Sequence, residues 1–333
     1  MAGGGIAMIG PGGVGDEMVV PATVKSKLNI EYQSIVNSNQ SCFGGGVAVF
    51  SVELAVTGGT TIQSNEADSS LYTPVTGDNV PSWNCAGAGI LLYRQSKLNL
   101  LNSQLLDNAV ITETGQQSAG AGVYIHGTSQ ALTNGASTLV NHNYDEQYDC
   151  VNYGGGFYVE STAALTINNG SISENVADYG AGVYSTGSVT INGGFLEENS
   201  ANQDGGGIYS TTNLNIYEGL VYNNTVKRNG GGIYGKNVCF TFGGSGEVCD
   251  NKALGTASGA TSTKGRGGGI YISAGGYLVM LSGSIHDNRA RYTGGGVLLY
   301  CPLYPVFPSA SSIYDNTKGP DSNPQTSNVE TES

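Results

Sequence analysis

Short stretches of alternating apolar and polar residues recur along the whole chain. In one of them the apolar positions are Leu98 and Leu100. Alternation with a period of two is the pattern of a β-strand that buries one face. A shorter apolar segment stands on each side of such a stretch, so one unit contains three short strands separated by turns, as at 208–210, 214–216 and 220–222.

A glycine cluster precedes the first strand of each unit. The string Gly-Gly/Ala-Gly followed by an apolar residue occurs ten times, and its shortest spacing, from Gly180 to Gly205, is 25 residues. Self-similarity of this kind indicates a repeat architecture, and we interpret longer spacings as the same unit with insertions. The clusters begin at Gly3, Gly44, Gly87, Gly120, Gly154, Gly180, Gly205, Gly230, Gly267 and Gly294.

A second repeated feature is an aliphatic residue three places before an asparagine. Because Asn tolerates left-handed backbone angles, we expect this column in turns, with the stacked amides hydrogen-bonded to one another. The pairs are Val36/Asn39, Ile62/Asn65, Leu105/Asn108, Val140/Asn143, Ile172/Asn175, Leu196/Asn199, Val221/Asn224, Val248/Asn251, Ile285/Asn288 and Ile313/Asn316.

These columns predict an all-β fold, a right-handed parallel β-helix of about ten rungs over residues 1–318. The apolar residue after each glycine cluster should stack into one interior ladder. Residues 319–333 are polar and predict a flexible tail or linker. Insertions fall mainly between the Asn and the next glycine cluster, at 66–86, 109–119, 144–153 and 252–266, and should gather along one edge of the rod.

Composition narrows the functional classes. The 333 residues include 53 Gly, and 13 Lys+Arg against 26 Asp+Glu give a net charge of −13. Such an acidic chain lacks the basic footprint of a nucleic-acid-binding protein. No apolar run reaches the ~18 residues of a membrane span, and the first residues do not form a signal peptide.

The repeats resemble the GGA[ILV] and FxxN motifs of the chlamydial polymorphic outer membrane proteins and related bacterial β-helix surface adhesins. The matching segments include Gly205-Gly206-Gly207-Ile208 and Leu196-Glu197-Glu198-Asn199. The Phe of FxxN is an aliphatic residue here in every repeat, and no C-terminal barrel follows. The resemblance implies an adhesin, extracellular or on the bacterial cell surface in association with the outer membrane, that binds a glycan or a host or cell-surface protein.

One exposed aromatic column is the strongest candidate binding face. The residue two places after the glycine cluster is Tyr in six consecutive units, and its neighbour faces inward, so we expect these rings to line an outer face. Two interpretations stay open: packing of the rings between rungs, which stabilises the sheet by itself, or a platform for a glycan or a protein partner. The insertion-loop edge, which carries the single tryptophan Trp83, is the other candidate. The column consists of Tyr124, Tyr158, Tyr184, Tyr209, Tyr234 and Tyr271.

Catalytic chemistry is less well supported, and we expect a non-catalytic protein without cofactors. A hydrolase needs two carboxylates on one face, for which Asp178 and Asp204 are the best pair. The three histidines, His126, His142 and His286, are scattered and predict no metal site. A polysaccharide lyase or glycoside hydrolase of β-helix fold, and a purely structural stalk, remain the alternatives.

The chain has six cysteines and no CxxC motif. Their pairing would indicate whether the protein functions in an oxidising, extracellular compartment. Cys42 and Cys85 each stand two places before a glycine cluster in successive units, which would bring them within disulfide range. Cys239 and Cys249 share one unit. Disulfides at these two pairs would indicate export of the protein.

Overall fold

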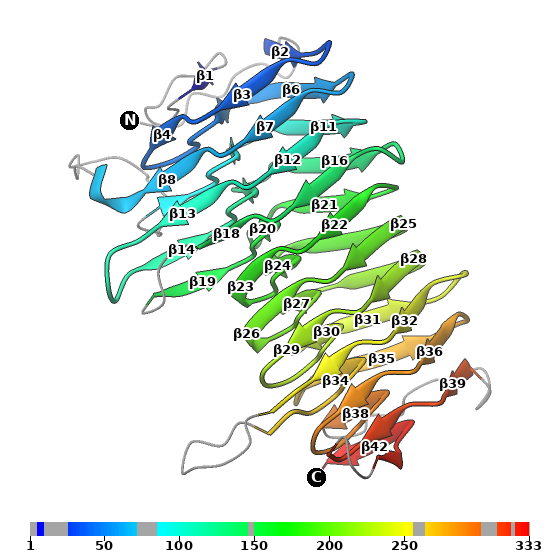
Figure 1. The fold of residues 1–333 in the computed structure, drawn as a ribbon. Coiled ribbons are helices and arrows are strands. Elements are labelled where there is room, and N and C mark those ends of the chain that lie inside the picture. Colours follow the sequence, from blue (N-terminus) through cyan, green and yellow to red (C-terminus); the bar gives the residue numbers. More distant parts are fainter. Residues whose placement is uncertain are drawn as a thin grey trace.

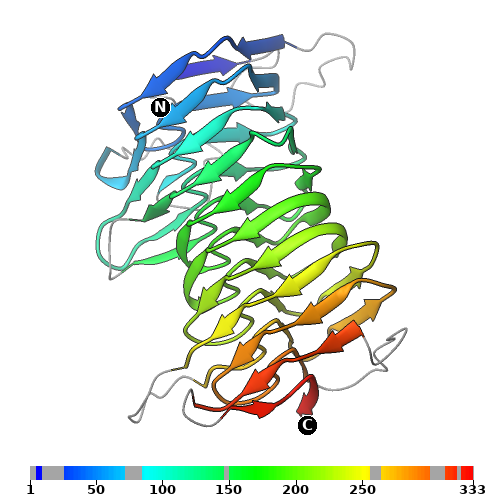
Figure 2. The same cartoon turned by 45° about the vertical axis from the view of Figure 1, so that its right-hand side comes forward.

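The chain coils into a right-handed parallel β-helix (Figure 1). The computed structural model describes residues 5–9, 26–71, 85–145, 150–255, 264–300, 312–320 and 324–332. Seen from a second direction, the rungs stack along one axis from the N-terminal to the C-terminal end (Figure 2). The fold class predicted from the repeats is confirmed.

Sheet 1 consists of the strands that follow the glycine clusters. They pair in parallel and in register, so that Val183 aligns with Ile208 and Ile208 with Ile233. The strands are β1 (Ile6–Ile9), β5 (Val47–Phe50), β10 (Ile90–Tyr93), β15 (Val123–Ile125), β20 (Phe157–Val159), β24 (Val183–Ser185), β27 (Ile208–Ser210), β30 (Ile233–Gly235), β34 (Ile270–Ile272), β38 (Val297–Tyr300) and β42 (Val329–Glu332).

Sheet 2 contains the alternating stretches and the strands that end before the Asn column. These form two faces, which β25 and β28 join by running through the bend between them. The strands are β2 (Ser26–Ile30), β3 (Ile35–Asn37), β6 (Val52–Thr57), β7 (Thr61–Gln63), β11 (Lys97–Leu101), β12 (Gln104–Leu106), β16 (Gln130–Asn134), β17 (Leu139–Asn141), β21 (Ala164–Ile167), β22 (Ser171–Ser173), β25 (Ser188–Glu197), β28 (Leu214–Tyr222), β31 (Cys239–Phe242), β32 (Glu247–Cys249), β35 (Tyr277–Met280), β36 (Ser284–His286) and β39 (Ile313–Tyr314).

Sheets 3 and 4 lie between the Asn column and the next glycine cluster, together with one short 3-10 helix, η1 (Ser69–Leu71). Sheet 3 is formed by β4 (Gln40–Ser41), β8 (Glu66–Asp68), β13 (Ala109–Ile111) and β18 (Tyr144–Asp145). Sheet 4 is formed by β9 (Cys85–Ala86), β14 (Gln117–Ala119), β19 (Val151–Tyr153), β23 (Val176–Tyr179), β26 (Ser200–Asp204), β29 (Thr225–Val226), β33 (Lys252–Ala253), β37 (Arg289–Ala290), β40 (Thr317–Lys318) and β41 (Gln325–Thr326).

The main core is the predicted interior ladder. The residues that follow the glycine clusters, such as Val183, Ile208 and Ile233, are fully buried and pack with the inward residues of sheet 2. A narrower second core lies against sheet 4, where small residues such as Ala201 and Ala253 fill the space. Stacked apolar ladders of this kind provide most of the stabilisation of a solenoid.

The asparagines form a continuous hydrogen-bonded ladder along the rod, as predicted. Asn199 is fully buried, its Nδ2 donates to Asn224 Oδ1 at 3.0 Å, and its Oδ1 accepts from Asn175 Nδ2 at 3.0 Å. The expectation that Asn itself takes the left-handed turn is wrong. That conformation falls on the residue before it, such as Glu198 with φ 56°, which leaves the Asn side chain free to point inward.

The glycine clusters make the sharp corner between sheets 4 and 1. Gly205 has a φ of +72°, which a residue with a side chain rarely adopts. At Gly206 a Cβ would lie 2.3 Å from the carbonyl oxygen of Gly231 in the next rung. The tight inward position predicted for the middle residue of the cluster is confirmed.

Residues 324–332 form strands, so the prediction of a flexible tail over 319–333 is wrong for this described part of it. Strand β41 turns back antiparallel to β40, and β42 pairs in register with β38, with Val329 opposite Val297. Asn328 Oδ1 accepts a hydrogen bond from Asn316 N at 3.2 Å and so extends the ladder. Residues 324–332 therefore continue sheets 1 and 4 and the asparagine ladder.

Helices play almost no part in the described fold. Among the residues that the structure describes, no helix is long and apolar enough to cross a membrane.

Candidate functional site

The six predicted tyrosines form one continuous column on sheet 1. Tyr184 stacks between Tyr158 and Tyr209, with ring centroids 5.2 and 4.8 Å apart. The same stacking continues from Tyr124 through Tyr271. The predicted alignment of these rings is confirmed.

The expectation that this column forms an open face is wrong for most of its length. Tyr124 is completely buried, and Tyr158, Tyr209 and Tyr271 are at most 7% exposed. The glycine corner folds sheet 4 back beside sheet 1, so the rings fill the angle between the two sheets. Tyr179 of sheet 4 packs edge-on against Tyr209 at 5.7 Å, which explains the burial.

The two carboxylates considered for catalysis do not share a face. Tyr179, rather than Asp178, is the register partner of Asp204, and adjacent residues of a strand point to opposite sides. Asp204 accepts a hydrogen bond from Asn229 Nδ2 at 2.8 Å and lies 3.9 Å from Arg228. Burial raises the pKa of Asp204, although Arg228 and Asn229 oppose this effect. This arrangement is a supporting network beside the tyrosine column.

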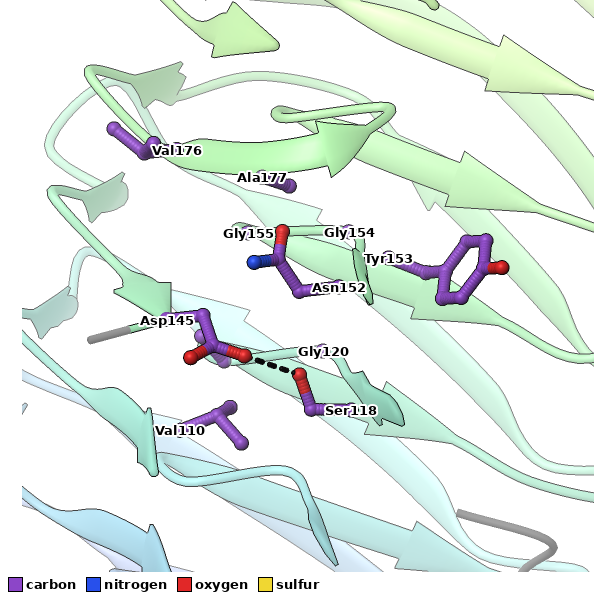
Figure 3. Close-up of a pocket in the computed structure, with 11 residues that line it drawn as sticks. Val110, Ser118, Gly120, Asp145, Asn152, Tyr153, Gly154, Gly155, Val176 and Ala177 are labelled. Atoms are coloured by element: carbon purple, nitrogen blue, oxygen red, sulfur yellow. Dashed lines mark hydrogen bonds between the residues drawn. The ribbon is translucent and has the colours of Figure 1, made fainter. Parts of the chain in front are cut away.

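A small cavity lies between sheets 3 and 4 (Figure 3). Its volume is about 10 Å³, close to the space that one water molecule needs. Ser118 Oγ donates to Asp145 Oδ2 at 2.6 Å across the wall, and the side chain of Asn152 lies close by. The cavity is too small for an organic ligand.

A long concave surface lies on the outer face of sheet 2. It is a groove of about 570 Å³ across β2, β6, β11, β16 and β21. Register pairing stacks Lys27, Glu53, Lys97 and Gln130 in one column along it. Lys27 Nζ lies 3.7 Å from Glu53 Oε2.

A second column of the groove carries amides. Asn29 and Asn99 stand in register on either side of Ala55, and Asn99 Oδ1 is a buried acceptor without a hydrogen-bond partner. The sequence interpretation did not single out this groove. The signal was present, because these residues occupy the polar positions of the alternating stretches in successive rungs.

The insertion-loop edge is described only in part. Trp83 lies outside the described residues, so its contribution stays a prediction. A shallow hollow at this edge is lined by Asp68, Ser70 and Glu113, among others. It has a more acidic lining than the groove of sheet 2.

Two of the cysteines, Cys42 and Cys85, lie on adjacent rungs as their spacing predicted. The bridge between Phe43 and Ala86 brings Cys42 and Cys85 side by side on adjacent rungs. Cys85, Cys239 and Cys249 are thiols in the structure, so neither predicted disulfide is formed in it. Burial raises the pKa of Cys249 to about 12, with carboxylates of Asp250 and Glu247 adding to the effect. The disulfides stay a prediction for the oxidised protein, which mass measurement with and without reductant checks.

Comparison with known proteins adds no assignment: no protein-family model, no curated protein and no solved structure matches the chain.

Proposed function

We propose that the protein is a non-catalytic, extracellular or cell-surface binding protein of the adhesin type, and that it binds an extended glycan in the groove of sheet 2. The observation that carries the proposal is the groove itself. Its volume of about 570 Å³ is within the range of small-ligand sites, and its long axis follows the stacked rungs. The repeat motifs support the surface location through their resemblance to bacterial adhesins.

The lining chemistry favours an acidic sugar chain. Lys27 and Lys97 place two cations in register on either side of Glu53, in a protein whose net charge is −13. The amides of Asn29 and Asn99 offer donors and acceptors to sugar hydroxyls. A small rotation of the Asn99 amide would present its unpaired oxygen to such a hydroxyl.

Binding fits this groove better than hydrolysis does. Glycoside hydrolysis uses two carboxyl groups roughly 5–10 Å apart. Among the residues lining the groove, Glu53 is the single carboxylate, and its neighbour Lys27 lies within 4 Å. The lyase or hydrolase alternative therefore has less support here than ligand binding.

The test compares binding of uronic-acid and neutral oligosaccharides on a glycan array, followed by calorimetry. The double variant Lys27→Gln/Lys97→Gln should weaken binding of acidic oligosaccharides at least about tenfold, because each lost charge-assisted hydrogen bond contributes about 1.5–3 kcal/mol. Lys236→Gln, at an exposed turn outside the groove, is the charge control. Retained binding in the double variant, or equal loss in the control, would contradict the groove assignment.

The same oligosaccharides distinguish the alternatives. Release of new reducing ends or unsaturated products over time would favour the enzyme. Absence of both binding and turnover, across acidic and neutral glycans and cell-surface proteins, would favour the stalk.

A further inference from the structure

Three side chains of different metal-binding types converge on the second face of sheet 2, far along the chain from the groove. Cys249 ends β32, and its register partner on the next rung is His286, which ends β36. Glu247 stands two residues before Cys249, on the same face of β32. The ligand atoms of the three residues all lie within 4.8 Å of one another.

The imidazole is held in the orientation that a metal site requires. His286 Nδ1 lies 2.7 Å from Asp287 Oδ2, so that carboxylate engages one ring nitrogen. The other nitrogen, Nε2, points toward Glu247 Oε2 at 4.0 Å. Tyr314 stacks on the ring at 4.9 Å and restricts its rotation. A carboxylate on the second nitrogen is the usual support of a metal-ligating histidine.

We propose that Glu247, Cys249 and His286 form a binding site for a divalent cation of the zinc class. A thiolate, an imidazole and a carboxylate are the ligand types that Zn²⁺ takes, whereas Ca²⁺ and Mg²⁺ require oxygen ligands. Three protein ligands leave a fourth tetrahedral position open to water or to a partner's side chain.

The geometry needs little adjustment to close on the ion. Tetrahedral zinc with ligand distances of about 2.0–2.3 Å places neighbouring ligand atoms ~3.3–3.6 Å apart. The present separations, up to 4.8 Å, exceed this by roughly 1 Å, which a small rotation of the half-exposed Glu247 and of the Cys249 side chain can remove. Cys249 is buried at the base of the cluster, and Glu247 forms the solvent-facing side.

The surroundings favour a cation over a simple ion pair. Asp287 and Asp250 flank the cluster beside Glu247, so acidic side chains surround Cys249 and His286. An ion pair between His286 and Glu247 would not involve the thiol of Cys249, which stands in register beside the ring and adds a third ligand atom. The second predicted role of Cys249, a disulfide with Cys239, would remove the thiolate and therefore compete with metal binding.

Calorimetric titration of the full chain with Zn²⁺, in a non-chelating buffer with a phosphine reductant, tests the site. One ion should bind per chain. Cys249→Ser and His286→Gln should each weaken binding at least about tenfold, and Asp287→Asn, which alters only the positioning residue, should weaken it by ~10–100-fold. Cys239→Ser and His142→Gln are matched controls, because His142 also pairs with an aspartate, Asp107, at 2.6 Å.

Cobalt provides a readout that is independent of affinity. Co²⁺ bound to the site should show a near-ultraviolet thiolate-to-metal absorption band that disappears in Cys249→Ser and persists in Cys239→Ser. Circular dichroism of each variant checks that the β-helix is intact. No stoichiometric binding by the reduced, folded protein, or binding unchanged by Cys249→Ser and His286→Gln, would overturn the proposal. Glycan binding in the groove is a separate measurement, so either proposal can fail alone.

Discussion

The asparagine ladder allows a quantitative prediction at Asn199, in the middle of the rod. Its Oδ1 accepts from Asn175 N at 3.1 Å and from Asn175 Nδ2 at 3.0 Å. Its Nδ2 donates to Ile172 O at 2.9 Å and to Asn224 Oδ1 at 3.0 Å. Asn199→Ala removes all four hydrogen bonds at a fully buried position and leaves the backbone N–H of Asn175 without this acceptor.

The expected loss follows from these contacts. A hydrogen bond contributes about 1 kcal/mol net, so four of them amount to ~4 kcal/mol. A domain of ordinary stability has only about 5–15 kcal/mol in total, so the variant should be severely destabilised. Asn215→Ala, on the outward side of β28 and only half-buried, is the control and should change the stability by less than about 0.5 kcal/mol.

Urea unfolding followed by circular dichroism gives the two free energies. Because solenoid rungs can open locally, hydrogen exchange measured by mass spectrometry should also show faster exchange in peptides covering residues 172–178. If Asn199→Ala lost less than about 1 kcal/mol, or no more than Asn215→Ala, the buried amides would not stabilise the rod in the way inferred here.

Two further predictions concern pH. Burial raises the pKa of Tyr184 and Tyr234 from 10.0 to about 12. The stability that their neutral rings contribute should therefore be lost as pH rises above 10. Urea midpoints measured from pH 9 upward check this, and midpoints that stay constant up to pH 12 would contradict it. Burial raises the pKa of Glu330, but hydrogen bonds from Lys318, Ser327 and Thr293 outweigh it and hold the pKa at about 2. The packing of β42 should therefore lose stability as pH falls from 4.5 toward 2, and Glu330→Gln should flatten that dependence in acid unfolding curves.

The repeated columns explain why the architecture could be predicted from the sequence. Equivalent residues of successive rungs lie in register in the same sheet. The environment of Ile208 or Asn199 is therefore repeated at the equivalent residue of the other rungs. Apolar, glycine and asparagine columns each have a single physical requirement, namely burial, a sharp corner or an amide ladder. A requirement repeated ten times is visible without any structure.

The tyrosine column shows where that reasoning ends. Alternation correctly predicts that Tyr209 points away from the main core, opposite to Ile208. It does not predict what packs on the other side, because the angle between sheets 4 and 1 depends on the positive φ of Gly205 and on Tyr179 in the preceding rung. The alternating pattern of a strand predicts which side chains point away from the core. Which residues pack on those side chains depends on how the sheets are arranged in the cross-section of the coil.

The candidate sites follow from the same geometry, since binding chemistry arises wherever different polar residues share one register position in consecutive rungs. Cys249 and His286 stand two residues before the ladder asparagines of neighbouring rungs, although 37 residues separate those asparagines in the chain. Counting histidines along the sequence therefore missed the cluster, and aligning the rungs on the asparagine column would have found it. Lys27, Glu53 and Lys97 become neighbours by the same stacking. In a parallel β-helix, residues of one site are typically one rung apart. An insertion between two rungs lengthens their separation in the sequence but leaves them neighbours in space, so the site is difficult to recognise from sequence spacing.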